Sequence, residues 1–249
     1  TGDKMNEDKR ITGLVEDKLL QHEEQYVFTC TGFLNLHERS LAEGVAKGRG
    51  AFYGGYEGAE RVIFLCLPEY TTLEEEEPLC LLRVKKAQGS KALTHRDYLG
   101  SLVGLGINRS KIGDILVQED GADIVILKEM GEFLLLHYDQ AGRVPLKAEL
   151  LPIAQLRVPV IRMEQVKDTV ASLRLDNVIA SAFSLSRAKA AEAIASGLVF
   201  VNKREQGKVD FKVNEGDELV LRGKGKVFLA EIAGRSRKDR VQIVIEQYK

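Results

Sequence analysis

The sequence predicts an α+β protein of three successive units, and three observations favour this class. Runs with an apolar residue every three or four positions, typical of helices, occur among shorter runs that read as strands. Prolines close several of these runs, as at Pro68 and Pro78. The length of 249 residues and a composition that is 44% hydrophobic and 29% charged are typical of globular proteins with one to three domains. We expect the units at residues 1–78, 79–165 and 170–249.

Two helices and a strand are expected in the first unit. The helices lie near residues 15–25 and 36–47, and the strand is "RVIFLCL", which ends at Pro68. The acidic run "TTLEEEEP" follows and is predicted to be a solvated connector that Pro78 closes. The first unit is therefore predicted to be a small α+β domain.

The middle unit is predicted to contain strands and helices in the order βαββαβ. Its strands are expected in "LCLLRVKKA", "IGDILVQ", "ADIVILK" and "AQLRVPVIR", and its helices in "THRDYLGSLVGLG" and "EMGEFLLLHYDQAG". This order suggests a four-stranded antiparallel sheet with both helices on one face, the ferredoxin-like architecture of RNA-recognition-motif domains. The strand "ADIVILK" departs from that motif because it lacks the exposed aromatic residues that stack on RNA bases.

Local matches to catalytic and metal-binding motifs are incomplete. "HRD" at residues 95–97 lacks the other parts of a kinase catalytic loop, and Thr94 as a helix cap with Asp97 three residues on explains it better. The glycine-containing runs do not have the spacing of phosphate-binding loops. The four histidines and three cysteines show no metal-ligand spacing. We expect no catalytic residue, no metal and no cofactor.

Membrane and secretion signals are missing from the sequence. No segment has the length and apolar character of a membrane span, and the opening "TGDKMNEDKR" has no apolar signal-peptide core. Cys30, Cys66 and Cys80 form neither a CxxC pair nor an even set, so we expect buried thiols rather than a reactive one. These features predict a cytoplasmic protein without membrane insertion.

The charges are divided unevenly along the chain. Residues 174–249 hold 15 Lys and Arg against 10 Asp and Glu, a balance of +5, whereas residues 1–173 hold 21 against 27, a balance of −6. This asymmetry suggests a nucleic-acid-binding module joined to a more neutral body.

The stretch "RLDNVIASAFSLSRAKAAEAIASGLVFVNKR" begins at Arg174 and reads as two short helices and a strand. An apolar stripe that includes Phe183 predicts the first helix, and Ser186 and Gly197 are expected to cap the start and the end of the second. "LVFV" then alternates as a strand. Free backbone N–H groups at both helix starts are expected to attract an anionic phosphate, to which Arg174 and Arg187 add guanidinium donors.

These ordered residues, with "VNEGDELVLRGKGK" downstream, resemble the S4-type RNA-binding domain. The family pattern of Arg-Leu-Asp, Ser-Arg, Gly-x-Val-x-Val-Asn and Gly-Asp stands here at residues 174–176, 186–187, 197–202 and 216–217. The resemblance implies one basic groove that reads the shape of structured RNA. The expected contact residues are Arg174, Asp176, Ser186, Arg187, Lys189, Asn202, Lys203, Arg222, Lys224 and Lys226.

Nearly the whole chain is similar to the YlmH family of bacterial S4-domain proteins. The strings that carry this resemblance are "FLNLHER", "GGYEGAER" and "THRDYLGSLVGLGINRSKIGDILV". The family is found mainly in Gram-positive bacteria and is encoded among cell-division genes. It implies a ribosome-associated quality-control factor that binds rRNA of the large ribosomal subunit, with peptidyl-tRNA as a further candidate ligand and quality-control or cell-division proteins as candidate partners.

Two other functions remain open. Pseudouridine synthases also carry S4-type domains, so an RNA-modifying enzyme is one alternative, although nothing before residue 165 resembles their catalytic domain with its essential Asp. The other alternative is a cell-division adaptor whose N-terminal two-thirds bind protein. The YlmH resemblance favours the non-catalytic RNA-binding function over both.

Overall fold

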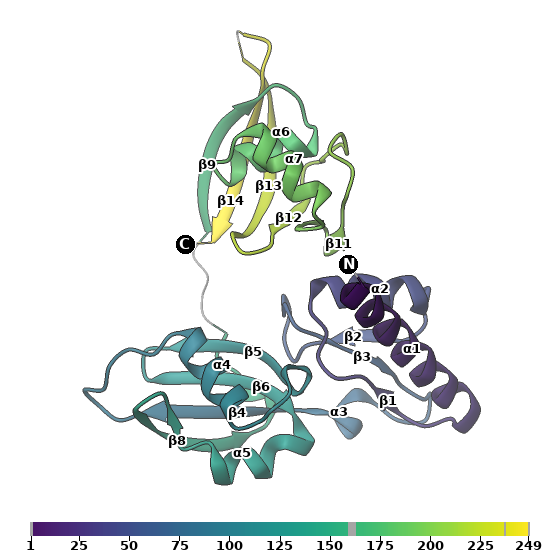
Figure 1. Cartoon of the computed structure of the whole chain (residues 1–249), viewed down its shortest axis with the longest axis vertical. Helices are drawn as coiled ribbons and strands as arrows, with labels where there is room; N and C mark the ends of the chain where they lie inside the picture. Colours follow the sequence, from purple (N-terminus) through teal and green to yellow (C-terminus); the bar gives the residue numbers. More distant parts are fainter. Residues whose placement is uncertain (1, 159–162, 237, 249) are drawn as a thin grey trace. The chain divides into compact units, whose positions relative to one another are not determined.

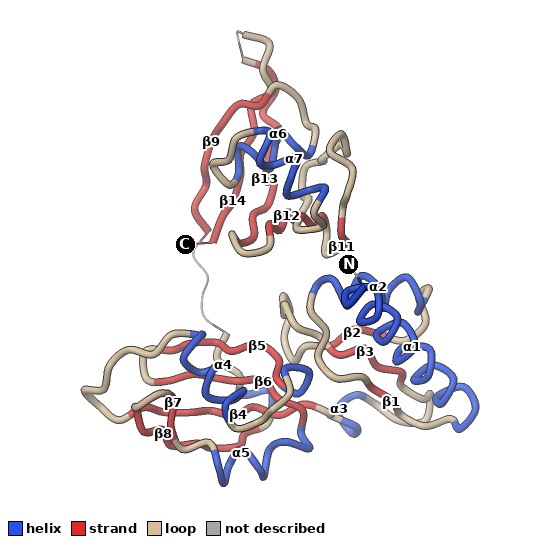
Figure 2. The backbone as a smooth tube through the Cα atoms, viewed as in Figure 1, coloured by secondary structure: helices blue, strands red, loops and turns tan. Residues whose placement is uncertain are grey.

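The computed structural model describes residues 2–158, 163–236 and 238–248. The chain forms two compact units, Thr1–Pro159 and Val160–Lys249, here called the N-terminal and the C-terminal unit (Figure 1). Helices accompany three antiparallel sheets, which confirms the α+β class (Figure 2). Within the described ranges, no helix has the length and apolar character needed to cross a membrane. A division of the N-terminal unit near residue 78 stays a prediction.

The first sheet of the N-terminal unit packs against two helices. Its strands, in the order β1-β3-β2, are Thr29–Cys30 (β1), Ile63–Cys66 (β3) and Ala51–Tyr53 (β2), and the helices are Gly2–Gln25 (α1) and Leu36–Ala46 (α2). Ile11, Val15 and Leu19 of α1 are buried with Phe64 of β3. Helix α1 begins well before the predicted start at residue 15, because Ile11 extends the same four-residue apolar spacing upstream.

The acidic run "TTLEEEEP" is not simply a connector. It contains the short helix α3 (Leu73–Glu76). Thr72 Oγ1 accepts the backbone N–H of Glu75 at 3.3 Å, and the Glu75 carboxylate accepts that of Thr72 at 3.0 Å. This reciprocal capping box stabilises a turn of helix where the acidic residues alone suggested solvated coil.

The second sheet of the N-terminal unit has the order β5-β6-β4-β8-β7, and every neighbouring pair is antiparallel. Its strands are β4 (Leu79–Lys86), β5 (Ile112–Gln118), β6 (Gly121–Leu127), β7 (Gln140–Ala141) and β8 (Val144–Leu151). The strands predicted in "LCLLRVKKA", "IGDILVQ" and "ADIVILK" are thus confirmed.

The prediction of a last strand in "AQLRVPVIR" is wrong for the residues of this run that the structure describes. Ile153–Gln155 forms a 3₁₀ turn (η3), and residues 159–162 lie outside the described part of the chain. The strand beside β4 is instead β8, whose Leu146, Ala148 and Leu150 face the helices at alternate positions. The prediction overlooked this period-two pattern in "VPLKAELL".

Both faces of the second sheet are covered at its centre. Helices α4 (His95–Gly104) and α5 (Gly131–His137) pack on one face, where Tyr98 and Leu134 are buried against Ile124. On the other face, Val125 is buried with Phe33 of the segment that follows the first sheet's β1. All residues of β6 are buried. The apolar run "ADIVILK" is therefore that of a strand covered on both sides.

The helix predictions of the middle unit are confirmed with different ends. Thr94 caps α4 and forms the predicted capping box with Asp97. Helix α5 is shorter than "EMGEFLLLHYDQAG", because Lys128–Met130 forms a 3₁₀ turn (η2) and residues 140–141 join β7.

The C-terminal unit has one six-stranded antiparallel sheet in the order β11-β10-β12-β13-β14-β9. The strands are β9 (Met163–Val170), β10 (Val199–Val201), β11 (Arg204–Glu205), β12 (Glu218–Leu221), β13 (Gly225–Arg235) and β14 (Val241–Tyr248). Helices α6 (Leu175–Ala182) and α7 (Arg187–Ala195) lie against this sheet (Figure 1). Ile179 and Ile194 of the helices are buried with Leu219 of the sheet. Phe183, expected within the buried stripe, follows α6 and is half-buried.

Candidate nucleic-acid interface

A buried carboxylate joins the starts of α6 and α7. Asp176, in the first turn of α6, is 3% exposed. Its Oδ1 accepts a hydrogen bond from Arg174 Nε at 3.1 Å, and its Oδ2 accepts one from Arg187 Nε at 2.8 Å. Arg174 is the N-cap residue of α6 and Arg187 the first residue of α7. Asp176 thereby holds the two predicted arginines side by side.

The guanidinium groups of this cluster face solvent while the carboxylate does not. The side chains of Arg174 and Arg187 are 41% and 58% exposed, against 5% for that of Asp176. Burial alone would raise the pKa of Asp176, but hydrogen bonds from both arginines and their positive charges lower it below its ordinary value. In the described chain, the two terminal nitrogens of Arg187 have no partner. They remain available to an external anion.

The two helix starts differ in their free backbone donors. At α6 the N–H groups of Leu175 and Asp176 donate to the carbonyls of Phe211 and Val209 at 2.8 and 3.1 Å, so the expected free donors are absent there. At α7, Ser186 Oγ accepts the N–H of Lys189 at 3.2 Å.

The N–H groups of Arg187 and Ala188 have no partner among the described residues, and both residues are exposed. Of these two helix starts, only that of α7 presents unsatisfied donors together with the positive end of the helix dipole. Ser186 caps this helix, and Lys189 lies exposed in its first turn.

Asn202 has a structural place in the fold. Asn202 and Lys203 form the two-residue turn between β10 and β11, with φ of 49° and 68°, as a type I′ turn requires. Asn202 Nδ2 donates to Asp217 Oδ1 at 2.8 Å, and its Oδ1 accepts the N–H of Glu218 at 2.9 Å. The amide is thus used to join two hairpins, whereas no side-chain partner of Lys203 is found in the described chain.

The basic turn at residues 222–224 lies at the other end of α7. The N–H of Arg222 donates at 2.8 Å to the carbonyl of Leu198, which follows the C-terminus of α7. Nine residues of helix, about 13 Å, separate that end from Arg187. Arg222 and Lys224 are exposed, but Lys226 lies 3.7 Å from the carboxylate of Glu218. The predicted single groove is therefore divided into a helix-start part and a turn part.

Sequence reasoning missed Lys212. It is paired with Arg174 in an isolated antiparallel bridge, so their side chains lie on the same face of the backbone, and Lys212 is exposed. The alternation of Lys208, Asp210 and Lys212 in "KVDFKV" was the available signal. Its location beside α6 could not be read from that pattern, because residues 174 and 212 are far apart in the sequence.

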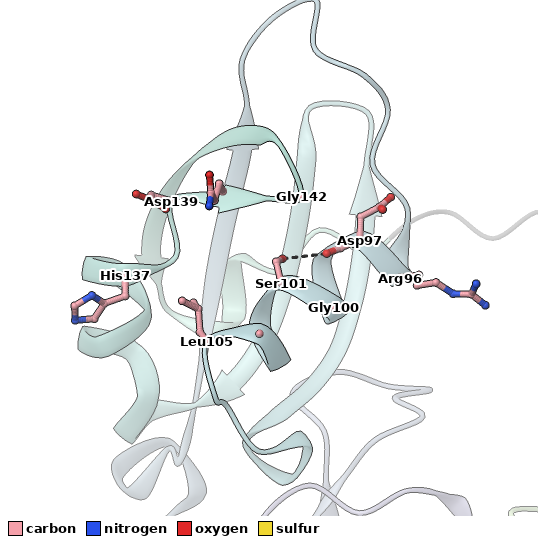
Figure 3. Close-up of a pocket in the computed structure, with 10 residues that line it drawn as sticks. Arg96, Asp97, Gly100, Ser101, Leu105, His137, Asp139 and Gly142 are labelled. Atoms are coloured by element: carbon pink, nitrogen blue, oxygen red, sulfur yellow. Dashed lines mark hydrogen bonds between the residues drawn. The ribbon is translucent and has the colours of Figure 1, made fainter.

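A hollow of about 500 Å³ in the N-terminal unit, lined by parts of α4 and α5, offers no catalytic set (Figure 3). Ser101 Oγ is bonded to the carbonyl of Asp97 at 3.0 Å and lies 3.0 Å from the hydroxyl of Tyr138. The Asp97 carboxylate accepts the N–H and hydroxyl of Thr94, both at 2.7 Å. Arg96 and His137 point in opposite directions in Figure 3. The hollow therefore presents no base positioned beside its serine.

All three thiols are free. Burial raises the pKa of Cys30 and Cys66, and it raises that of Cys80 to about 11. Thiols of this kind are poor nucleophiles at neutral pH. Cys66 is buried as expected, whereas Cys30 and Cys80 are only partly buried.

Two family models match the chain. Residues 74–155 match a model described as a putative RNA-binding domain in YlmH, and residues 173–219 match the S4 domain. The second match covers Asp176 and both helix starts.

Two known proteins are similar to this chain. The first match covers most of both chains, and the second covers most of the known structure. The chain is 36% identical over 231 residues to ribosome-associated protein quality control protein P2 of Bacillus subtilis (strain 168), which covers 91% of this chain and 90% of that protein. It also resembles the solved structure of the cell division protein ylmH from Streptococcus pneumoniae. That match has a TM-score of 0.51 and 26% identity, and covers 61% of this chain and 95% of the other.

Proposed function

The chain belongs to the YlmH family, and on that premise we propose that it is a non-catalytic RNA-binding protein that acts on the large ribosomal subunit in ribosome-associated quality control. The observation that carries this proposal is the cluster at the start of α7, where Asp176 orients Arg174 and Arg187 and two backbone N–H groups are free. The name of the Bacillus subtilis relative supports the quality-control role.

The ligand proposed for this cluster is a phosphate group of structured RNA. Guanidinium groups bind phosphate through paired N–H donors, and a helix start adds backbone N–H groups and a positive dipole end. Lys189, Lys203 and Lys212 add positive charge, while Arg222 and Lys224 contact a second part of the backbone. Contacts of this kind read the shape of a duplex rather than its bases, as rRNA and peptidyl-tRNA helices would require.

Asp176, Ser186, Asn202 and Lys226 have supporting roles in this proposal. Asp176 is a positioning residue, because it is buried and bonds both arginines. Ser186 caps α7, Asn202 joins two hairpins, and Lys226 is close to Glu218.

We also propose three domains, with an RNA-recognition-motif-like middle one, at the predicted residues 1–78, 79–165 and 170–249. Strand β9 (Met163–Val170) pairs with β14 and is assigned to the third of them. Each sheet of the N-terminal unit has its own helices, which supports a boundary near residue 78. The strand order β5-β6-β4-β8, with α4 and α5 on one face, supports the ferredoxin-like arrangement. The covered opposite face argues against RNA stacking on this sheet.

A cytoplasmic location follows from the proposed ribosomal partner. The three free thiols support a reducing compartment. The second candidate function is a cell-division adaptor, which the name of the Streptococcus pneumoniae protein favours. Exposed apolar side chains on α5, such as Leu136 at 76% exposure, would suit such a protein contact.

Co-sedimentation of the full chain with purified large ribosomal subunits tests the proposal. We expect wild type to sediment with the subunit and Arg187→Gln to do so about ten- to hundredfold less tightly. Arg235→Gln is the matched control, because it removes the same charge from an exposed arginine that pairs with Asp239 in the same unit. Wild type that stays in the supernatant at low salt would refute the proposal.

The alternatives predict other results. Modified nucleosides missing from the RNA of a deletion strain would favour an RNA-modifying enzyme. Septal localisation that survives RNase treatment would favour the adaptor.

A further inference from the structure

Two arginines of the N-terminal unit converge on one carbonyl oxygen. Arg61 Nε and Arg109 Nη1 both donate to the carbonyl of Ile112, at 3.0 and 2.6 Å. Arg61 Nη2 also donates to the carbonyls of Phe33 and Arg109, each at 3.1 Å. Neither guanidinium has a carboxylate within ion-pair distance in the part of the chain that the structure describes. Like charges placed together without such a partner are unusual in a half-buried site.

The carboxylates near this pair are already engaged. The oxygens of Asp114 accept the hydroxyl of Tyr56 and the N–H groups of Glu60 and Arg61, at 2.8 to 3.0 Å. The Glu38 carboxylate accepts the N–H of Asn35 at 2.7 Å, at the start of α2. Both carboxylates lie close enough to favour the charged guanidiniums but do not contact them.

Electrostatics agree with this geometry. Burial lowers the pKa of Arg61, and burial together with the charge of Arg61 lowers the pKa of Arg109 to about 10. Desolvation and the charge of Arg109 likewise lower the pKa of His95 at the start of α4. An anion at this place would relieve the repulsion.

Donors remain for such an anion. Among the described residues, Arg61 Nη1 and Arg109 Nε and Nη2 have no partner, and both side chains are half-buried rather than enclosed. Two planar guanidiniums with spare N–H groups suit a phosphate, whose oxygens accept several donors at once.

The backbone around the pair is closely packed. A Cβ added to Gly54 would lie 2.3 Å from the Cβ of Ala59, and one added to Gly113 would lie 2.7 Å from the ring of Phe33. Because neither glycine has a side chain, the loop before Arg61 and the strand after Arg109 can pack this closely against their neighbours. The strings "GGYEGAER" and "GINRSKIGD", far apart in the sequence, therefore meet here with their arginines preorganised.

We propose that Arg61 and Arg109 bind a phosphate group of the RNA backbone, as a second RNA contact besides the start of α7. RNA is the favoured source of the phosphate because Arg109 lies within residues 74–155, which match the putative RNA-binding domain. The central sheet of that region cannot stack bases on the face that packs against Phe33 and Ile63, so contacts must come from its loops. This proposal rests on the proposed function.

A salt titration of RNA binding by the full chain, with purified large-subunit rRNA as the probe, tests the pair. We expect Arg109→Gln to weaken binding about tenfold and to make the slope of log affinity against log salt less negative by about 1. Arg49→Gln is the matched control, because Arg49 is exposed in the same unit and pairs with Glu23. It should change neither quantity.

A folded Arg109→Gln variant that binds like wild type with an unchanged slope would overturn this inference. If Arg187→Gln weakens binding in the same assay, the proposed function stands without it, and if wild type does not bind, the proposed function fails. Should melting show that Arg109→Gln unfolds, modification of wild type by phenylglyoxal decides. We expect rRNA to protect Arg109 from the reagent several-fold and to leave the modification of Arg49 unchanged. Equal modification of Arg109 with and without rRNA would overturn the inference. No modification of Arg109 in either case would overturn it as well.

Discussion

Each unit contains a buried carboxylate that bonds two arginines, and the two clusters differ in what the arginines do next. In the N-terminal unit Asp123, on β6, is 0% exposed and accepts from Arg83 and Arg157, each at 2.8 Å. In the C-terminal unit Asp176 accepts from Arg174 and Arg187. The side chain of Arg83 is 14% exposed, whereas that of Arg187 is 58% exposed.

The remaining donors separate a structural cluster from a binding one. Arg83 Nη2 also donates to the carbonyl of Gln155 at 2.7 Å, and Arg157 Nη1 bonds the carboxylate of Asp120 at 3.0 Å. The guanidinium donors of the first cluster thus bond groups of the protein itself and hold residues 155–157 against the sheet. The second leaves the outer nitrogens of Arg187 free. A buried carboxylate that bonds two arginines therefore indicates a binding site only where the guanidinium groups keep N–H donors without a partner in the protein.

The largest effect is expected for the structural cluster. Asp123→Ala leaves Arg83 nearly buried without its partner, so we expect the N-terminal unit to lose about 3 kcal/mol of unfolding free energy. Arg157 keeps Asp120 and limits the loss. Urea denaturation followed by circular dichroism measures it. A loss below about 1 kcal/mol would mean that the cluster is not the structural one.

Acid should weaken the same cluster. Burial alone would raise the pKa of Asp123, but hydrogen bonds from Arg83 and Arg157 lower it to about 2. Because the folded pKa lies below the unfolded value of about 3.9, the contribution, on the order of 2 kcal/mol, is present above pH 4 and is lost as the pH falls toward 2. Stability curves of wild type and Asp123→Asn should converge over this range. Parallel curves would contradict the assignment.

In the binding cluster the expected loss is in affinity rather than stability. Arg187→Gln should keep the melting temperature within about 2 °C of wild type, because Asp176 keeps Arg174, while binding to large subunits weakens by about 1.5–3 kcal/mol. The double variant Arg174→Gln with Arg187→Gln should also melt earlier, because it leaves the buried Asp176 with neither arginine. Equal melting of the single and double variants would show that the carboxylate does not need these partners.

The smallest effects are expected at the basic turn. Arg222→Gln should weaken RNA binding by about 0.5–1 kcal/mol and reduce the salt slope by about 1. Lys226→Gln should do less, since Lys226 is close to Glu218 and its side chain is 15% exposed. A filter-binding titration at several salt concentrations compares them. If Lys226→Gln lost more RNA affinity than Arg222→Gln, the RNA contact would lie at Lys226 on β13 rather than at Arg222.

Local signals were sufficient to predict several elements of both units. The sequence alone predicted α4 with its Thr94 cap, the strand β5, and α7 with Ser186 as its cap. These features depend on side chains within three or four residues of one another. The spacing of apolar residues and the capping residues therefore predict them. The ordered residues of the S4 resemblance likewise located the two helix starts before any packing was known.

Contacts between distant residues were decided by the tertiary structure. It made Asp176 a buried positioning residue, used the amide of Asn202 to reach Asp217, and satisfied the helix start at α6 with the carbonyls of Val209 and Phe211. It also brought Arg61 and Arg109 to one carbonyl across 48 residues. Nothing in a local pattern states which distant donor meets which acceptor, because burial and hydrogen-bond satisfaction are settled only when separate elements pack together.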